Sequence, residues 1–200
     1  MTDTTHHYRT IVVDPPWEHT KVTGKRTDDN AGSSWNELTG IASVLPYETM
    51  SLREIASLPV PRLAHADCNL FLWTFGKWVP DAYRLAVGWG FDPVTLLTWC
   101  KAPRGLGLGG AFVPTTEFML YARQGRENRL GRCDTTWWEW PRGRHSEKPA
   151  AAYTTIASVS PVPRIDLFAR RPRPGWDVWG DDPWLDAWGG RSSVRLPDDP

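Results

Sequence analysis

Residues 9–17 read RTIVVDPPW, and this short stretch decides how the rest of the chain is interpreted. The β-branched run 10–13 is typical of a buried strand, and the two prolines at 15 and 16 end it abruptly. Asp14 is therefore expected at the carboxyl end of a strand. In open α/β sheets this is the edge where ligands bind.

Apolar strand segments alternate with helical segments along the rest of the chain. Further strands are expected at 69–74, 94–99, 116–121, 164–168 and 177–179. Helices are expected after a capping box at 51–54, from Pro80 to about residue 88, and after Pro149. This alternation predicts an α/β fold with one mostly parallel sheet and helices on both faces.

A chain of 200 residues fits one domain, which we expect to span residues 1–182. Residues 18–45 are rich in Gly, Ser, Thr, Asp and Lys and show no periodicity, so we expect a flexible active-site loop. Residues 183–200 are dominated by Pro, Asp, Gly and Arg, which predicts a loosely ordered C-terminal tail.

Charge and cysteine content limit the class of protein. Lys+Arg and Asp+Glu both total 23, so binding of nucleic acid or membranes through bulk charge is not expected. Local basic stretches remain, because residues 101–148 hold nine basic and five acidic residues, and arginines recur at 164, 170, 171 and 173. Three widely spaced cysteines and the lack of a signal peptide or long apolar run predict a cytoplasmic protein without a metal site or membrane contact.

The stretch DPPW at 14–17 suits chemistry on the exocyclic amine of adenine, which is a poor nucleophile because its lone pair is delocalised into the ring. The Asp14 carboxylate can accept one N–H of that amine, and the Pro15 carbonyl, held rigid by the Pro-Pro unit, can accept the other. Trp17 can stack on the base, which is worth ~1–3 kcal/mol. The alternative is a rigid turn without chemistry.

The glycine-rich stretch GLGLGG at 105–110 matches a dinucleotide-binding pattern in sequence but not in its surroundings. The residues before it and the extended segment after it do not supply the strand and helix that the pattern requires. We therefore interpret it as a flexible loop.

Several motifs together resemble the MT-A70-like family of S-adenosylmethionine-dependent N6-adenine methyltransferases. They are DPPW at 14–17, PYETMS at 46–51, LFLWT at 70–74, GWGF at 88–91, TEFMLYAR at 116–123, HSEKP at 145–149 and RIDLFAR at 164–170. The resemblance runs from about residue 8 to residue 181. It implies a Rossmann-like methyltransferase fold in permuted motif order, with the catalytic strand first and the cofactor segment last.

The resemblance also implies roles for individual residues. Asp14, Pro15 and Pro16 would form the catalytic turn that holds the target amine, with Trp17 flanking the adenine. Tyr47 and Glu117 would line the acceptor pocket. The residues implied in binding S-adenosylmethionine are Asp14, Lys148, Phe168, Arg170, Gly180 and Asp181. The chain departs from the family pattern at 171–173 (RPR) and 181–182 (DD), where the family often has His-Asn and Asn-Gln.

Some residues have two interpretations. Lys148 could be a solvated residue at a helix start, and Trp73 and Trp99 are expected in the core. The run WWEW at 137–140 could be either a satellite core cluster or a nucleic-acid surface with stacking rings.

The expected activity is methyl transfer from S-adenosylmethionine to the N6 amine of adenine in DNA. RNA is the alternative substrate, and a non-catalytic nucleic-acid-binding partner subunit is the alternative from another class. The resemblance leaves room for a homodimer or a heterodimer.

Overall fold

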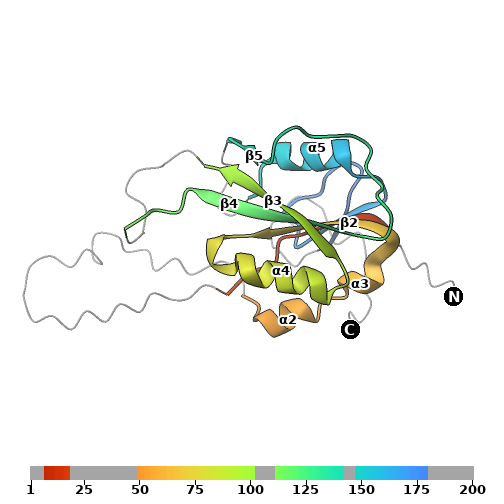
Figure 1. Cartoon of the computed structure of the whole chain (residues 1–200), viewed down its shortest axis with the longest axis horizontal. Helices are drawn as coiled ribbons and strands as arrows, with labels where there is room; N and C mark the ends of the chain where they lie inside the picture. Colours follow the sequence, from red (N-terminus) through yellow and green to blue (C-terminus); the bar gives the residue numbers. More distant parts are fainter. Residues whose placement is uncertain (1–6, 19–48, 102–110, 142–146, 180–200) are drawn as a thin grey trace, which may run out of the picture.

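One seven-stranded sheet organises the molecule, with strand order β5-β3-β4-β2-β1-β6-β7 (Figure 1). The computed structural model describes residues 7–18, 49–101, 111–141 and 147–179. The strands are β1 (Tyr8–Val13), β2 (Ala64–Thr74), β3 (Asp92–Cys100), β4 (Thr116–Gln124), β5 (Trp137–Trp138), β6 (Arg164–Leu167) and β7 (Asp177–Trp179). The predicted strands are all present, and β2 begins five residues earlier than expected.

The sheet is mixed but mostly parallel. β1 pairs in parallel with β2 and β6, as do β6 with β7 and β3 with β5. Only β4 is reversed, since it is antiparallel to both β2 and β3. Residues 101–115 connect β3 to β4, and the part of this connection that the structure describes, 101 and 111–115, holds no helix.

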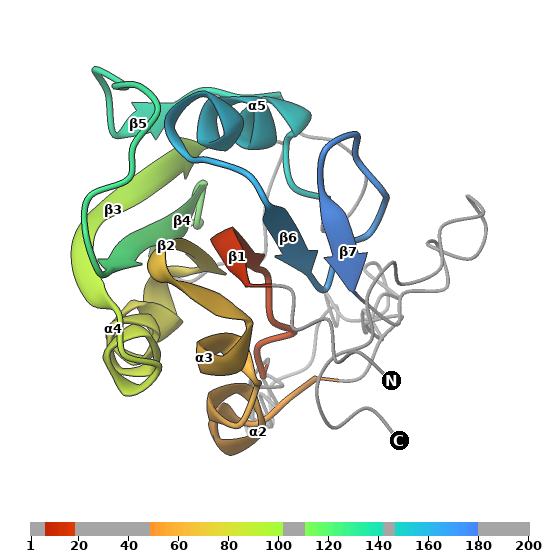
Figure 2. The same ribbon diagram turned by 90° about the vertical axis from the view of Figure 1, so that its right-hand side faces the viewer.

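Helices cover both faces of the sheet, as predicted (Figure 2). They are α2 (Leu52–Ala56), α3 (Val60–Leu63), the short 3-10 helix η1 (Gly76–Trp78), α4 (Val79–Gly88) and α5 (Ala150–Val159). The capping box is present at α2, where Ser51 and Glu54 bond reciprocally. No helix in the described ranges is long and apolar enough to cross a membrane.

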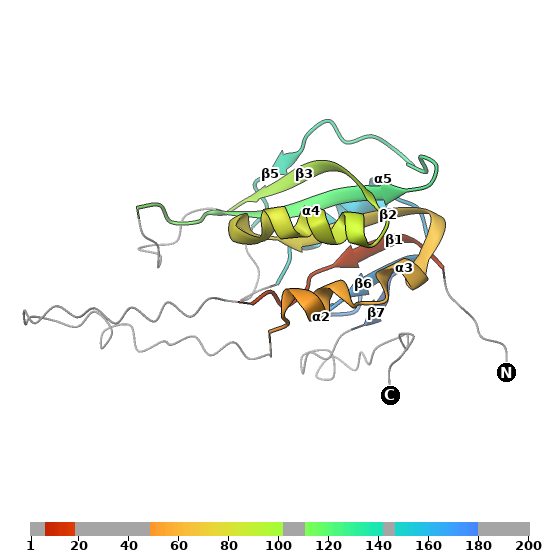
Figure 3. The same cartoon turned by 60° about the horizontal axis from the view of Figure 1, so that its bottom comes forward.

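The two faces carry separate cores. On one face α2, α3 and α4 cover the sheet, with α4 over β2, β3 and β4 (Figure 3). On the other face α5 packs against a smaller aromatic core. Side chains of β1 alternate between them, so that Ile11 and Val13 join the first core and Val12 joins the second. This alternation directs Asp14, two residues after Val12, to the α5 face.

Candidate active site

Strand direction brings the candidate residues to one edge of the sheet. The carboxyl ends of β1, β3 and β6 meet there, and the reversed β4 begins there. Asp14 follows β1, Lys101 follows β3, and Glu117 is the second residue of β4. Because β1 lies between β2 and β6, Asp14 stands where the strand order reverses, which is the usual ligand site of an open α/β sheet.

Four side chains of alternating sign form a row at this edge, which we term the charged quartet: Asp14, Lys148, Glu117 and Lys101. The Lys148 Nζ lies 2.8 Å from Asp14 Oδ2 and 3.5 Å from Glu117 Oε2. Lys101 Nζ binds the other carboxylate oxygen, Glu117 Oε1. Lys148 thus bridges two carboxylates, and Lys101 closes the row beside β3.

The charged quartet is largely buried, since its side chains are between 12% and 23% exposed. Burial alone would lower the pKa of Lys148, but the Asp14 and Glu117 carboxylates outweigh it and raise that pKa above its ordinary value. Burial would likewise raise the pKa of Glu117, but Lys148 and Lys101 hold it below its usual value. Both groups therefore stay ionised near neutral pH. The alternative of a solvated Lys148 is wrong.

Two tryptophans line the row. Lys148 Nζ lies 5.3 Å from the ring centre of Trp73, and Lys101 Nζ lies 4.7 Å from that of Trp99. The two rings meet edge to face at 6.3 Å. Both are buried, which confirms their expected place in the core. An ammonium over an aromatic face is stabilised by the ring quadrupole, so these rings help to hold both lysines in place.

Backbone hydrogen bonds fix the DPPW turn. The Asp14 N–H donates to the carbonyl of Leu167 at 3.3 Å, which ties the turn to β6. The Pro15 carbonyl accepts from the Trp17 N–H, and the Pro16 carbonyl accepts from Met50, each at 2.8 Å. A carbonyl oxygen has two lone pairs, so Pro15 keeps one acceptor site for a further N–H.

The Trp17 side chain is part of the core. Its residue is 3% exposed, its ring stacks on Trp78 at 5.8 Å, and its Nε1 donates to the Trp73 carbonyl at 2.9 Å. In this arrangement the ring anchors the DPPW turn to β2 and η1. Stacking on an adenine, the role expected from sequence, would require the ring to leave these contacts.

The segment after β6 carries backbone strain. Phe168 has φ of +64°, a left-handed conformation that is rare for a bulky side chain. The N–H groups of Phe168 and Ala169 donate to the Trp179 carbonyl at 2.6 and 3.2 Å, and the Phe168 and Trp179 rings meet edge to face. Such strain persists where surrounding contacts over-determine it, and it is concentrated at functional sites.

Sequence reasoning missed a buried pair on the same face. Asp166 in β6 is fully buried and lies 2.6 Å from the Arg173 guanidinium, which covers the Tyr153 ring. Burial raises the pKa of Asp166 to about 7, against the opposing effect of Arg173. The signal was present, because an acidic residue inside the apolar strand RIDL needs a partner.

Three of the four arginines that recur near β6 have partners within the molecule. Arg173 pairs with Asp166, and Arg171 lies 3.0 Å from Glu147. Arg164 donates to the carbonyls of Ala157 and Ser160. Much of the positive charge near β6 is therefore paired within the molecule.

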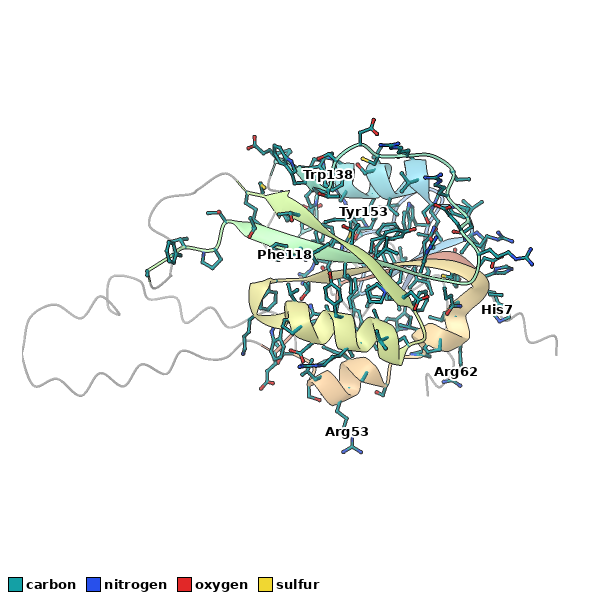
Figure 4. The ribbon with its side chains drawn as sticks, viewed as in Figure 1. His7, Arg53, Arg62, Phe118, Trp138 and Tyr153 are labelled. Atoms are coloured by element: carbon teal, nitrogen blue, oxygen red, sulfur yellow. The ribbon has the colours of Figure 1, made fainter. Side chains whose placement is uncertain are left out.

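Within the run WWEW, the structure supports the core interpretation for Trp140, and the nucleic-acid interpretation stays a prediction for the exposed Trp137. Trp138 stacks on Trp140 at 4.7 Å, and the Trp140 carbonyl accepts from Trp99 Nε1 at 2.8 Å. Trp140 packs against the α5-side core, to which Tyr153 belongs (Figure 4). Trp137 remains 57% exposed.

Several sequence predictions lie outside the described residues. They are Tyr47, Gly180, Asp181, the GLGLGG segment, residues 19–45 of the predicted loop and the tail 183–200. Among the described residues, no group of His, Cys, Asp or Glu side chains is placed to hold a metal ion.

Comparison with known proteins identifies the family. A type II methyltransferase of Mycoplasma sp, M.MunI, is 34% identical over 86% of this chain and 76% of its own length. The mouse (Mus musculus) N(6)-adenine-specific methyltransferase METTL4 is 24% identical over 86% of the chain but only 36% of its own length. The N6-methyladenosine RNA methyltransferase MTA1 of Cryphonectria parasitica is 26% identical over 86% of the chain and 50% of its own length. The MT-A70 family profile matches residues 8–182. Since that match runs from the first residue of β1 past the end of β7, the chain belongs to the MT-A70 family.

Proposed function

We propose that this protein transfers a methyl group from S-adenosylmethionine to the N6 amine of adenine in DNA. One observation carries the proposal, namely the ion pair between Asp14 and Lys148. Asp14 belongs to the DPPW turn at the carboxyl end of the central strand β1. It joins the residue proposed to hold the amine to the residue proposed to hold the cofactor.

The sheet supports a Rossmann-like methyltransferase fold in permuted order. β1, which carries the DPPW turn, comes first in the chain, and β6 and β7, which carry the proposed cofactor segment, come last, yet β1 and β6 are neighbours. Methyl donor and acceptor would then meet at the shared edge of these two strands. We propose residues 1–182 as this catalytic domain.

The residues present fit the proposed cofactor. Its methionine part has a carboxylate and an ammonium, which match the Lys148 ammonium and the Asp14 carboxylate. Its adenosine part needs an apolar wall and polar partners, for which Phe168 and Arg170 stand directly after β6. When bound, S-adenosylmethionine supplies an electrophilic methyl group on a positively charged sulfur.

The DPPW turn would activate the amine by accepting both of its N–H groups. With Asp14 Oδ1 or Oδ2 and the Pro15 carbonyl as acceptors, the nitrogen becomes pyramidal and its lone pair is free to form the new N–C bond. The methyl group would come from the cofactor held by Lys148 and Asp14, and the electron pair of its carbon–sulfur bond would stay on sulfur. The amine then loses one proton, for which the Asp14 carboxylate is the adjacent base.

DNA is favoured as the substrate by the pattern of relatives. The type II methyltransferase matches over 76% of its length, against 50% for the RNA methyltransferase. RNA remains the second candidate because that relative's name specifies it. The intact charged quartet argues against a non-catalytic partner subunit, since a surface that only binds nucleic acid has no use for a buried row of ion pairs.

The test offers duplex DNA, single-stranded DNA and RNA in parallel to the purified protein with labelled S-adenosylmethionine. Nucleoside mass spectrometry reads the products, and Asp14→Ala is the control. We expect N6-methyldeoxyadenosine with the wild type and none with the variant. If only RNA were methylated, giving N6-methyladenosine, the substrate would be RNA and not DNA. No product together with no cofactor binding would favour the non-catalytic subunit.

A further inference from the structure

Lys101 has a place in the site that no sequence motif suggested. It directly follows β3, where its N–H donates to the Thr115 carbonyl at 2.7 Å. In the β3–β4 ladder Trp99 lies opposite Glu117, so Lys101 is the diagonal neighbour of Glu117 on the same face. Diagonal pairs across antiparallel strands are within reach of long side chains. The Lys101 Nζ accordingly binds Glu117 Oε1.

Glu117 depends on two cations, one of which it shares. Among the described residues, the cations in contact with Glu117 are Lys148, from the segment before α5, and Lys101, which directly follows β3. Lys148 lies closer to Asp14, at 2.8 Å, than to Glu117, at 3.5 Å. If Lys101 were removed, Glu117 would compete with Asp14 for Lys148. Coulomb attraction rises as distance falls, so Lys148 would be drawn away from Asp14.

We propose that Lys101 is a positioning residue for methyl transfer, which holds Glu117 so that Lys148 stays paired with Asp14. The inference rests on the proposed function, in which Asp14 holds the amine and Glu117 lines the adenine pocket. Lys101 acts through these two carboxylates and does not touch the reacting atoms. Its ammonium also lies over the Trp99 ring, 4.7 Å from the ring centre, which helps to hold the charge in one place.

The substitution Lys101→Met tests this role because it keeps the stem and removes the charge. We expect kcat to fall roughly 10- to 100-fold, the range of a displaced catalytic group, with KM for the cofactor changed much less. Lys101→Arg should recover most of the loss. Arg53→Met is the matched control, because Arg53 is exposed on α2 and points away from the molecule (Figure 4); it should leave kcat unchanged.

A double-mutant cycle separates positioning from direct binding of nucleic acid. In a Glu117→Gln background, Lys101→Met should lower kcat by a further factor of less than about two, because both changes remove the same interaction. A loss of the same size in both backgrounds, with a raised KM for DNA, would overturn the proposal and make Lys101 a phosphate contact. Thermal unfolding of every variant checks that the fold is retained.

A measurement independent of activity separates this inference from the proposed function. Carboxyl-labelled glutamate, assigned through Glu117→Gln, reports the titration of Glu117 by NMR. With Lys101→Met the Glu117 titration should move to higher pH, since one of its two cations is gone. An active wild type with an unmoved titration overturns the role of Lys101. A wild type that binds cofactor but methylates nothing overturns the proposed function, even if the titration moves.

Discussion

Replacing Asp14 by Asn tests the centre of the mechanism with almost no change of shape. Asn loses the charge and keeps one side-chain oxygen, which would accept from Lys148 Nζ, the present partner of Asp14 Oδ2 at 2.8 Å, so that its N–H₂ group would face the amine. One acceptor for the target amine is lost or turned away. Removing one preorganised hydrogen-bond partner of a transition state costs about 2.7–4 kcal/mol, so kcat should fall roughly 100- to 1,000-fold.

The effect of Asp14→Asn on stability should be smaller. Removing one partner of a fully buried ion pair costs about 3–5 kcal/mol, because the other charge is left without compensation. Here Lys148 retains Glu117, 3.5 Å away, so we expect about 1–3 kcal/mol, the range for a lost charge-assisted hydrogen bond. For a chain of this length each kcal/mol lowers Tm by roughly 2–4 °C.

The assay compares single-turnover methylation of duplex DNA by wild type and Asp14→Asn at saturating cofactor, with cofactor binding by calorimetry and Tm by scanning calorimetry. The reasoning requires a large loss of rate with a folded protein. A variant that methylates within about tenfold of wild type, equivalent to ~1.4 kcal/mol of barrier, would show that Asp14 does not hold the amine.

Three further predictions concern neighbouring residues. Lys148→Met should weaken cofactor binding at least tenfold by calorimetry; unchanged affinity would restrict Lys148 to a structural role. The pKa of Asp166 is raised to about 7 in the folded chain, so protonated Asp166 stabilises the fold fully below about pH 4, and this stabilisation is lost as pH rises to about 7. The free energy of unfolding measured with urea should follow this trend in the wild type and not in Asp166→Asn. Trp137→Ala should weaken DNA binding several-fold at unchanged Tm, whereas Trp140→Ala should lower Tm; the opposite pattern would reverse the roles given to the two rings.

The fold and the position of Asp14 could be predicted from sequence because both depend on local patterns. A β-branched run stopped by two prolines specifies a strand end, and alternating segments specify a layered α/β sheet. The reversal of β4 was harder to see, although the sequence predicts a glycine-rich loop and no helix between β3 and β4.

The contacts within the site could not be predicted, because they depend on register between strands that are distant in sequence. Nothing local shows that Lys101 lies diagonal to Glu117, since this follows from the pairing of Trp99 with Glu117. Nothing local shows that Trp17 packs on Trp78, because a tryptophan beside a turn suits a core as well as it suits a base.

The alternating signs of the charged quartet explain how a carboxylate can be kept at this site at all. Asp14 and Glu117 alone would place two like charges at the edge where the proposed DNA substrate would approach, and these charges would repel each other. Lys148 and Lys101 bring the quartet to zero net charge while each carboxylate remains in contact with a cation. Under the proposed function, the site would offer an ionised acceptor to the amine without a net charge that repels DNA. Under the proposed function, a chain of zero net charge would thus act on a polyanion because the carboxylates at its site are each paired with a cation.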